Sequence, residues 1–371
     1  MSSARIHLLL ATQDHFPHSI LTFLRSLPAG VLVLLILLAI LPAVLVVRGF
    51  LIERRSDIRQ KHLEEDLDIL QRTLLPDVPE HLGQLTISTA YSPANGPGAG
   101  GDFFDVFTLP DNKIVALIGD LSGHGREALA GTAAIHYELR ARMKDGLEPR
   151  QALRRTSKTI GDELGGLFVT ALICVYDPKT SLFTWASAGH PKPLFVGKDH
   201  TAITAASAPP MGLGMISGQR QTTISLPEDT LICLHTDGLN ESILTEGRLG
   251  EDRLGQLLTL KARDTVTAQD LLDLVGEVTE TTPDDMAAVL LHVNQAPQTA
   301  ETYCEEILVS CDDDLTLVEK FIQKTGLTEE KKAACLEELQ AALCPDPVLV
   351  KIYPTLQEYN IAVEHVLPYH E

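Results

Sequence analysis

An uncharged run of twenty residues, from Pro28 to Val47, constrains this chain more than any other feature. Fourteen of the twenty residues are Leu, Ile or Val. A helix of that length is about 30 Å long, which matches the hydrocarbon thickness of a bilayer. The run therefore predicts a transmembrane helix over residues 28–47. A signal peptide is the alternative, but 27 residues precede the run and no small-residue cleavage pattern follows it.

Basic residues flank this run unequally, which predicts its orientation. The N-terminal segment, residues 1–27, offers only Arg5 and Arg25. Five basic residues follow the run closely: Arg48, Arg54, Arg55, Arg59 and Lys61. Because such residues are retained on the cytoplasmic side, everything after Val47 is expected in the cytoplasm. We therefore expect a single-pass protein of the cytoplasmic (inner) membrane.

Residues 48–76 are predicted to form a helical stalk that ends at Pro76. Leucines spaced four, three and four positions apart form a short heptad stripe: Leu63, Leu67, Leu70 and Leu74. Two heptads are too few to require a coiled coil. Two interpretations therefore stay open, a homodimer formed through the stripe and a single helix that packs on the following domain.

Composition narrows the class of the remaining chain. With 44% hydrophobic and 22% charged residues, a largely disordered protein is excluded. The formal net charge of −20 argues against nucleic acid as a partner, because binding to the phosphate backbone needs a basic footprint. The six cysteines include no C-x-x-C pair and are too sparse for a disulfide framework, so reduced thiols are expected.

Short β-rich runs dominate residues 77–295, with helices inserted in blocks. Strands are predicted at Leu85–Tyr91, Phe103–Leu109, Lys113–Gly119, Leu167–Tyr176, Leu182–Ala188, Thr222–Leu226, Thr230–Thr236 and Met286–Val293. Helices are predicted at Arg126–Lys144, Pro149–Leu164, Arg253–Lys261 and Ala268–Glu280. Because strands and helices do not alternate strictly, the pattern predicts an α+β domain of packed antiparallel sheets.

A polar stretch containing Pro297 separates this domain from residues 300–371. Helices are predicted there around residues 315–325 and 327–343, a strand at 348–353, and a further helix or strand at 356–366. The segment has no glycine-rich lid, so nucleotide binding is not assigned. We expect a small α/β module for interaction or dimerisation.

Aspartates fall at the ends of four predicted strands. They are Asp102 and Asp105, Asp120, Asp237, and Asp284 and Asp285. If these ends converge, carboxylates about 4 Å apart repel by several kcal/mol, and the cluster requires divalent cations. Oxygen-only ligands favour Mg²⁺ or Mn²⁺ over zinc. The alternative is that each aspartate caps a local turn.

Six motifs occur in order between residues 74 and 293. They are Gly100–Asp105, Ile118–Gly125, Phe168–Ala171, Ala188–Pro191, Thr236–Ser242 and Asp284–Met286. In these motifs the chain resembles the SpoIIE/RsbU branch of the metal-dependent (PPM) serine/threonine protein phosphatases. The resemblance implies a β-sandwich of two antiparallel sheets flanked by helices, with a two-metal centre at one end.

The resemblance also implies roles for individual residues. The expected ligands of two Mn²⁺ or Mg²⁺ ions are Asp102, Asp120, Asp237 and Asp284, together with the main-chain oxygen of Leu121. Supporting or water-mediated roles are implied for Asp105 and Asp285. Two cations held by shared carboxylates can activate water for in-line attack on phosphorus.

The identity of a proton donor stays open in the sequence. Eukaryotic relatives place a histidine two residues after the aspartate that corresponds to Asp120, where this chain has Ser122. His124 is a candidate donor, and the alternative is that its glycine neighbours serve only the turn into the next helix. His190 is expected to brace a strand turn.

The resemblance implies a membrane-anchored phosphatase that acts on a phosphorylated regulatory protein such as an anti-sigma-factor antagonist. A catalytically weak membrane scaffold that binds phosphoproteins is the alternative. A scaffold has no need for so many converging carboxylates. A metal-dependent nuclease would use the same carboxylates, but it conflicts with the acidic charge balance.

Overall fold

The computed structural model divides the chain into two units, Met1–Glu65 and Asp66–Glu371, and each is described by itself. The described residues are 28–31, 33–34, 38, 40–42, 44–55, 75–93, 101–123, 126–160, 164–196, 208–244, 247–260, 266–279, 284–297, 303–309, 318–319, 322–323, 328–342, 347–354 and 359–365.

In the first unit, the described residues between 29 and 55 are helical. Their apolar side chains are exposed, with Leu38 at 62% and Val46 at 72%. Part of the run 28–47 lies outside the described residues, and so does the leucine stripe of the predicted stalk. Across the described residues, no helix combines the length and the apolar character that crossing a bilayer requires.

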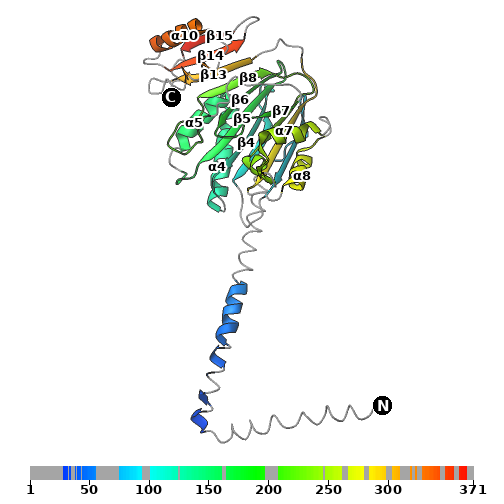
Figure 1. The fold of residues 1–371 in the computed structure, drawn as a ribbon, viewed down its shortest axis with the longest axis vertical. Helices are drawn as coiled ribbons and strands as arrows, with labels where there is room; N and C mark the ends of the chain where they lie inside the picture. Colours follow the sequence, from blue (N-terminus) through cyan, green and yellow to red (C-terminus); the bar gives the residue numbers. More distant parts are fainter. Residues whose placement is uncertain are drawn as a thin grey trace, which may run out of the picture. The chain divides into compact units, whose positions relative to one another are not determined.

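The second unit contains two large antiparallel sheets (Figure 1). The five-stranded sheet has the order β1 (His81–Leu82), β2 (Leu85–Ser92), β12 (Met286–Val293), β9 (Leu231–His235) and β7 (Leu194–Val196). The eight-stranded sheet has the order β15 (Tyr359–His365), β14 (Val348–Pro354), β13 (Tyr303–Val309), β8 (Arg220–Ser225), β6 (Leu182–Ala188), β5 (Val169–Asp177), β4 (Ile114–Leu121) and β3 (Asp102–Thr108).

The facing sides of the sheets form the central core. The alternation of side chains along each strand sends every second residue inward. Phe104 and Ile118 thus contact the core from the eight-stranded sheet, and Ile87 and Val289 contact it from the five-stranded sheet. Burial of this kind stabilises a fold by about 25 cal/mol per Å² of apolar surface.

Helices cover both outer faces of the sandwich. On the eight-stranded sheet lie α4 (Arg126–Lys144) and α5 (Pro149–Ile160), which bury Ile135 and Leu153 against β4 and β5. On the five-stranded sheet lie α7 (Gly250–Leu260) and α8 (Ala268–Val278). A capping box begins α8, with Thr267 and Asp270 as its two members. The short elements α6 (Asp237–Glu241), β10 (Ile243–Leu244) and β11 (Gly247–Arg248) connect β9 to α7.

The observed elements confirm the predicted architecture of antiparallel sheets with flanking helices. Helix α4 has the predicted bounds, and α5 is described over Pro149–Ile160, while residues 161–163 of the predicted helix lie outside the described residues. The strand β13 was not predicted, and it changes the domain organisation. It pairs with β8, so β13 and the two strands that follow it, β14 (Val348–Pro354) and β15 (Tyr359–His365), continue the eight-stranded sheet.

Within the described residues, the C-terminal module includes β13, β14, β15 and α10 (Glu329–Ala342), and residues 318–319 and 322–323 are also helical. Its own core includes Ile307, Ile322, Leu339 and Val350. The predicted helix at 327–343 and strand at 348–353 are confirmed, and the segment 356–366 contains the strand β15. The module is therefore attached through a continuous β-sheet, and the polar stretch near Pro297 connects strands of one assembly.

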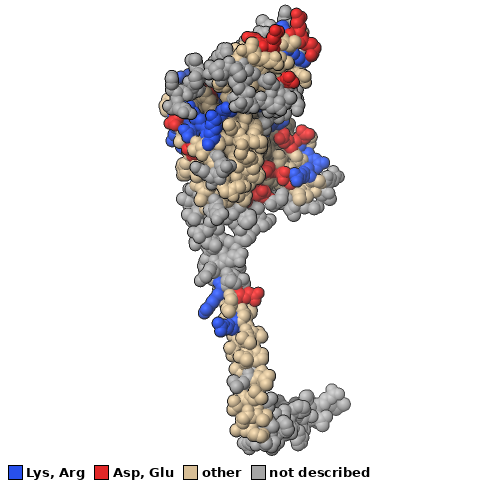
Figure 2. Space-filling model, turned by 90° about the vertical axis from the view of Figure 1, so that its left-hand side faces the viewer, with Lys and Arg blue, Asp and Glu red and all other residues tan. Residues whose placement is uncertain are grey.

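Charged side chains are unevenly distributed over this unit. Figure 2 looks onto the side that α5 covers and shows basic side chains gathered there; Arg155 and Lys158 are among the exposed residues of this helix. Acidic side chains gather at the end of the unit that carries the C-terminal module, where α10 exposes Glu337 and Glu338. Although acidic residues are in excess in the whole chain, part of the surface therefore carries mainly basic side chains.

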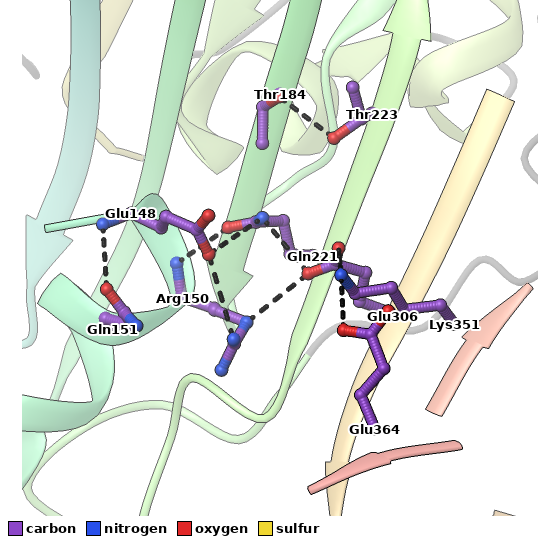
Figure 3. Close-up of polar contacts among 9 residues, drawn as sticks. All are labelled: Glu148, Arg150, Gln151, Thr184, Gln221, Thr223, Glu306, Lys351 and Glu364. Carbon is purple, nitrogen blue, oxygen red and sulfur yellow. Dashed lines mark hydrogen bonds and ion pairs between the residues drawn. The ribbon is translucent and has the colours of Figure 1, made fainter. Parts of the chain in front are cut away.

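A buried polar network joins the module to the sandwich (Figure 3). The Arg150 side chain is only 6% exposed, and its Nε lies 3.5 Å from Oε2 of Glu306 in β13. Gln221 in β8 accepts a hydrogen bond from the Arg150 main-chain N–H at 3.3 Å and donates one to Glu306 Oε2 at 3.3 Å. Burial raises the pKa of Glu306, while the Arg150 charge acts in the opposite direction.

Removal of the Glu306 carboxylate is expected to destabilise this seam. Glu306→Ala leaves the buried Arg150 guanidinium with a weaker set of partners, so we expect the free energy of unfolding to fall by about 2 kcal/mol. Glu364 is the control, because its carboxylate is 51% exposed and contacts Lys351 at 2.8 Å. Glu364→Ala should cost less than about 1 kcal/mol. Urea unfolding of both variants checks this, and equal losses would contradict a buried seam.

Candidate metal centre

The aspartates at the strand ends lie at one end of the sandwich. Asp102 begins β3 and is paired in register with Asp120 near the end of β4. In the other sheet, Asp237 follows β9, and Asp284 precedes β12, which is the antiparallel neighbour of β9. One hydrogen bond ties the two sheets together at this point, from Thr236 Oγ1 to Asp102 Oδ2 at 2.8 Å. The structure therefore brings together the strand ends that the sequence singled out.

Glycines allow the chain segments at this end to approach closely. A Cβ atom on Gly101 would lie 2.0 Å from the main-chain oxygen of Leu121 and 2.4 Å from Oδ1 of Asp120. The Leu121 N–H donates to Gly101 O at 3.1 Å, and the Thr132 hydroxyl of α4 donates to the same oxygen at 3.3 Å. The Leu121 carbonyl and the Asp120 carboxylate consequently lie side by side, as the predicted ligand set requires.

A second glycine, Gly238, allows a close approach of chain segments at the end of the five-stranded sheet. A Cβ atom on Gly238 would lie 1.9 Å from the main-chain oxygen of Asp285. The hydroxyl of Tyr91 in β2 donates to Asp285 Oδ2 at 2.9 Å, and the Asp285 N–H donates to Asp284 Oδ1 at 2.8 Å. Asp285 is thus held by its neighbours, and Asp284 is exposed.

Burial and neighbouring carboxylates raise the pKa values of Asp102, Asp120 and Asp237. Burial and then the charge of Asp120 raise the pKa of Asp102 well above its ordinary value. The pKa of Asp120 rises to about 7, because the partly buried side chain is poorly hydrated and because Asp237, Asp284 and Asp285 are negatively charged. Like charges disfavour ionisation in this way only when they are close. The five carboxylates therefore lie close to one another at this end of the sandwich.

The donors in this region suit a hard divalent cation. Carboxylate and carbonyl oxygens are the ligands that Mg²⁺ and Mn²⁺ prefer, and a cation would offset the repulsion that raises these pKa values. As the side chains stand, no three His, Cys, Asp or Glu residues in the described part of the chain have the arrangement of a metal site. The roles of Asp102, Asp120, Leu121, Asp237 and Asp284 as ligands stay predictions.

Asp105 lies apart from this group. It is three residues from Asp102, so its side chain leaves the opposite face of β3 and points into the helix layer. There it accepts hydrogen bonds from His136 Nε2 at 2.9 Å and from Arg140. Burial opposes ionisation, but these two partners hold the pKa of Asp105 below its ordinary value. Asp105 thus ties β3 to α4, and the structure places it away from the region where a ligand is expected.

Sequence reasoning missed Thr236, Tyr91, and the pair His136 and Arg140. The last two carried a signal, because positions i and i+4 of a helix share one face. His124 lies outside the described residues. His190 braces a turn, as expected: its ring Nδ1 contacts the Thr170 hydroxyl at 2.9 Å, and its main-chain N–H donates to Ser187 Oγ at 3.1 Å.

Comparisons with known proteins agree with this fold. Residues 110–294 match the model of the family described as Stage II sporulation protein E (SpoIIE). The solved SiaA-PP2C domain of Pseudomonas aeruginosa is 19% identical, covers 64% of this chain and 98% of its own, and superposes with a TM-score of 0.54. Residues 110–294 are thus similar to a SpoIIE-type domain, and the chain shares with the SiaA-PP2C domain a mixed α/β fold with antiparallel sheets.

Two curated proteins of Bacillus subtilis (strain 168) are also similar. The phosphoserine phosphatase RsbU is 25% identical over 205 residues, which is 54% of this chain and 60% of RsbU. The phosphoserine phosphatase RsbP is 23% identical over 145 residues, which is 38% of this chain and 36% of RsbP. The chain therefore aligns with less than two thirds of each of these relatives.

Proposed function

We propose that this protein is a metal-dependent phosphatase that hydrolyses phosphoserine or phosphothreonine on a regulatory protein. The observation that carries the proposal is the convergence of Asp102 and Asp120 from one sheet with Asp237 and Asp284 from the other, where the charges of Asp237 and Asp284 act on Asp120. The similarity to two proteins named phosphoserine phosphatases supports the substrate class.

The chain's own residues supply the positions for this chemistry. Asp102, Asp120, Asp237 and Asp284 would hold the cations, with the carbonyl oxygen of Leu121 beside Asp120. When bound, two such cations neutralise phosphoryl oxygens and activate water for attack on phosphorus. The hydrogen bonds from Tyr91 and Thr236 orient carboxylates at the rim, and Asp105 fixes β3 against α4.

The substrate that we propose is more specific than the fold alone indicates. By resemblance to the SpoIIE/RsbU branch, we propose an anti-sigma-factor antagonist, phosphorylated on serine or threonine, as the physiological substrate. Phosphoproteomics after induced expression of the protein would identify it. Loss of phosphate from proteins of an unrelated kind alone would contradict this part of the proposal.

Hydrolysis of p-nitrophenyl phosphate and of a phosphoserine peptide by the purified full chain tests the activity. We expect turnover with Mn²⁺ or Mg²⁺, none with excess EDTA, and recovery when the metal is restored. A protein that binds the phosphopeptide without turning it over under any of these conditions would be the scaffold, and the phosphatase proposal would fail. DNA in the same assay is expected to stay intact, and its cleavage would favour the nuclease.

We further propose that residues 28–47 anchor the protein in the cytoplasmic membrane, with the phosphatase domain in the cytoplasm. The uncharged apolar sequence and the basic residues after it support this proposal. Fractionation of cells that express the full chain should place it in the membrane pellet, resistant to high salt and carbonate, while a chain that begins at residue 48 should not sediment. Release of the full chain by carbonate would contradict the anchor.

The predicted stalk provides a separate test of signalling. If two catalytic domains are coupled through the leucine stripe, replacing Leu67 and Leu70 with polar residues should change activity and oligomeric state without abolishing metal binding. Unchanged activity and oligomeric state would count against coupling.

A further inference from the structure

Three strands meet at the Thr236 side chain, which is completely buried. Its main-chain N–H donates to the Ala287 carbonyl in β12 at 3.1 Å. Its hydroxyl accepts a hydrogen bond from the Ala287 N–H at 2.9 Å and contacts Asp102 Oδ2 in β3 at 2.8 Å. A single side chain after β9 thus connects the five-stranded sheet to the first carboxylate of the eight-stranded sheet.

The direction of these hydrogen bonds follows from the chemistry of the groups. A main-chain N–H can only donate, so the Thr236 hydroxyl must be the acceptor toward Ala287. Its one proton is then available for Asp102, whose Oδ2 accepts it. Because Oδ2 is held in this way, the carboxylate of Asp102 has a defined orientation, and its other oxygen Oδ1 is left to bind a cation.

We propose that Thr236 is a positioning residue that sets the orientation of the Asp102 carboxylate for cation binding. The assignment rests on the proposed function, because it takes Asp102 to be a ligand. It adds that the opposite sheet determines how this ligand is presented. Hydrogen bonds to ligands of this kind typically change metal affinity by about 10- to 100-fold when they are removed.

The other end of the same strand shows what an ordinary buried threonine does in this fold. Thr230 precedes β9, is 1% exposed, and donates its hydroxyl proton to the Pro227 carbonyl at 2.8 Å, within its own turn. Thr236 instead donates to a side chain 134 positions away in the chain. The comparison makes Thr230 the matched control for loss of a buried hydroxyl.

Calorimetric titration of the full chain with MnCl₂ tests the proposal, using wild type, Thr236→Val, Thr236→Ser and Thr230→Val. We expect Thr236→Val to weaken manganese binding by about 10- to 100-fold, and its activity to recover at correspondingly higher manganese. Thr236→Ser keeps the hydroxyl and should bind within about threefold of wild type. Thr230→Val should lower the melting temperature without changing manganese affinity.

Wild-type manganese affinity in a folded Thr236→Val variant would overturn the assignment, and so would an equal loss in Thr230→Val. If Thr236→Val gives no cooperative melt, Thr236→Cys takes its place, because a thiol has similar volume and is a weak donor. The manganese affinity of Thr236→Cys should be lower than that of wild type and of Thr236→Ser, but binding should still be detectable. Wild-type affinity in Thr236→Cys would overturn the assignment. A wild-type chain that takes up no manganese would instead contradict the proposed function itself.

Discussion

Asp120→Asn is expected to lower metal-dependent hydrolysis of p-nitrophenyl phosphate by roughly 10³-fold, since the charge stabilisation at stake amounts to several kcal/mol. The substitution keeps the shape of the side chain and removes its charge. Burial together with the charges of Asp237, Asp284 and Asp285 raises the pKa of Asp120 to about 7. Loss of the Asp120 charge is therefore expected to weaken cation binding strongly.

The same variant makes a prediction about stability. With EDTA present, Asp120→Asn should melt at a temperature no lower than wild type, because it removes one of several repelling charges. Asp111→Asn is the matched control, since Asp111 lies in the turn between β3 and β4 and pairs with Lys113 at the surface. That variant should keep full activity. Retained activity in Asp120→Asn, or an equal loss in Asp111→Asn, would contradict the assigned role.

Gly101→Ala is expected to abolish manganese uptake and to lower the free energy of unfolding by about 3 kcal/mol. A Cβ atom at this position would overlap the Leu121 carbonyl and the Asp120 carboxylate, so β3 and the end of β4 would have to separate. Main-chain atoms cannot make room as a flexible side chain can. Urea unfolding and calorimetric titration with MnCl₂ measure the two effects.

Gly276→Ala provides the control for this prediction. Gly276 lies in α8, and a Cβ atom there has no neighbour within 4 Å. Alanine in an exposed helix stabilises it by up to about 1 kcal/mol relative to glycine. The Gly276 variant should therefore be at least as stable as wild type with unchanged manganese uptake. A Gly101→Ala protein that binds manganese normally would show that the close approach at Gly101 does not matter for the site.

Much of the sandwich could be predicted from local pattern, because its strands alternate or are continuously apolar. The strand β13 is different. Its sequence places Glu305 and Glu306 side by side in the middle, which no propensity favours in a buried strand. The structure accommodates them because they leave opposite faces of the strand. Glu305 lies near Arg220 and Glu306 near Arg150, partners that only the tertiary fold supplies.

The candidate site shows the same division between local and tertiary information. Strand ends drew attention to six aspartates, and the family resemblance implied that four of them are ligands: Asp102, Asp120, Asp237 and Asp284. The structure brings these strand ends together. The separation of Asp105 from Asp102 was readable in principle, because residues three apart in a strand face opposite sides. The role of Thr236 was not, because its partner Asp102 belongs to the other sheet.

We propose that aspartates from both sheets jointly hold a pair of cations. Crystals of the full chain grown with MnCl₂ would test it through an anomalous difference map recorded at the manganese edge. We expect two peaks at the end of the sandwich, bounded by Asp102 and Asp120 on one side and by Asp237 and Asp284 on the other. Peaks that contact aspartates of one sheet only, or no peaks at this end, would contradict it.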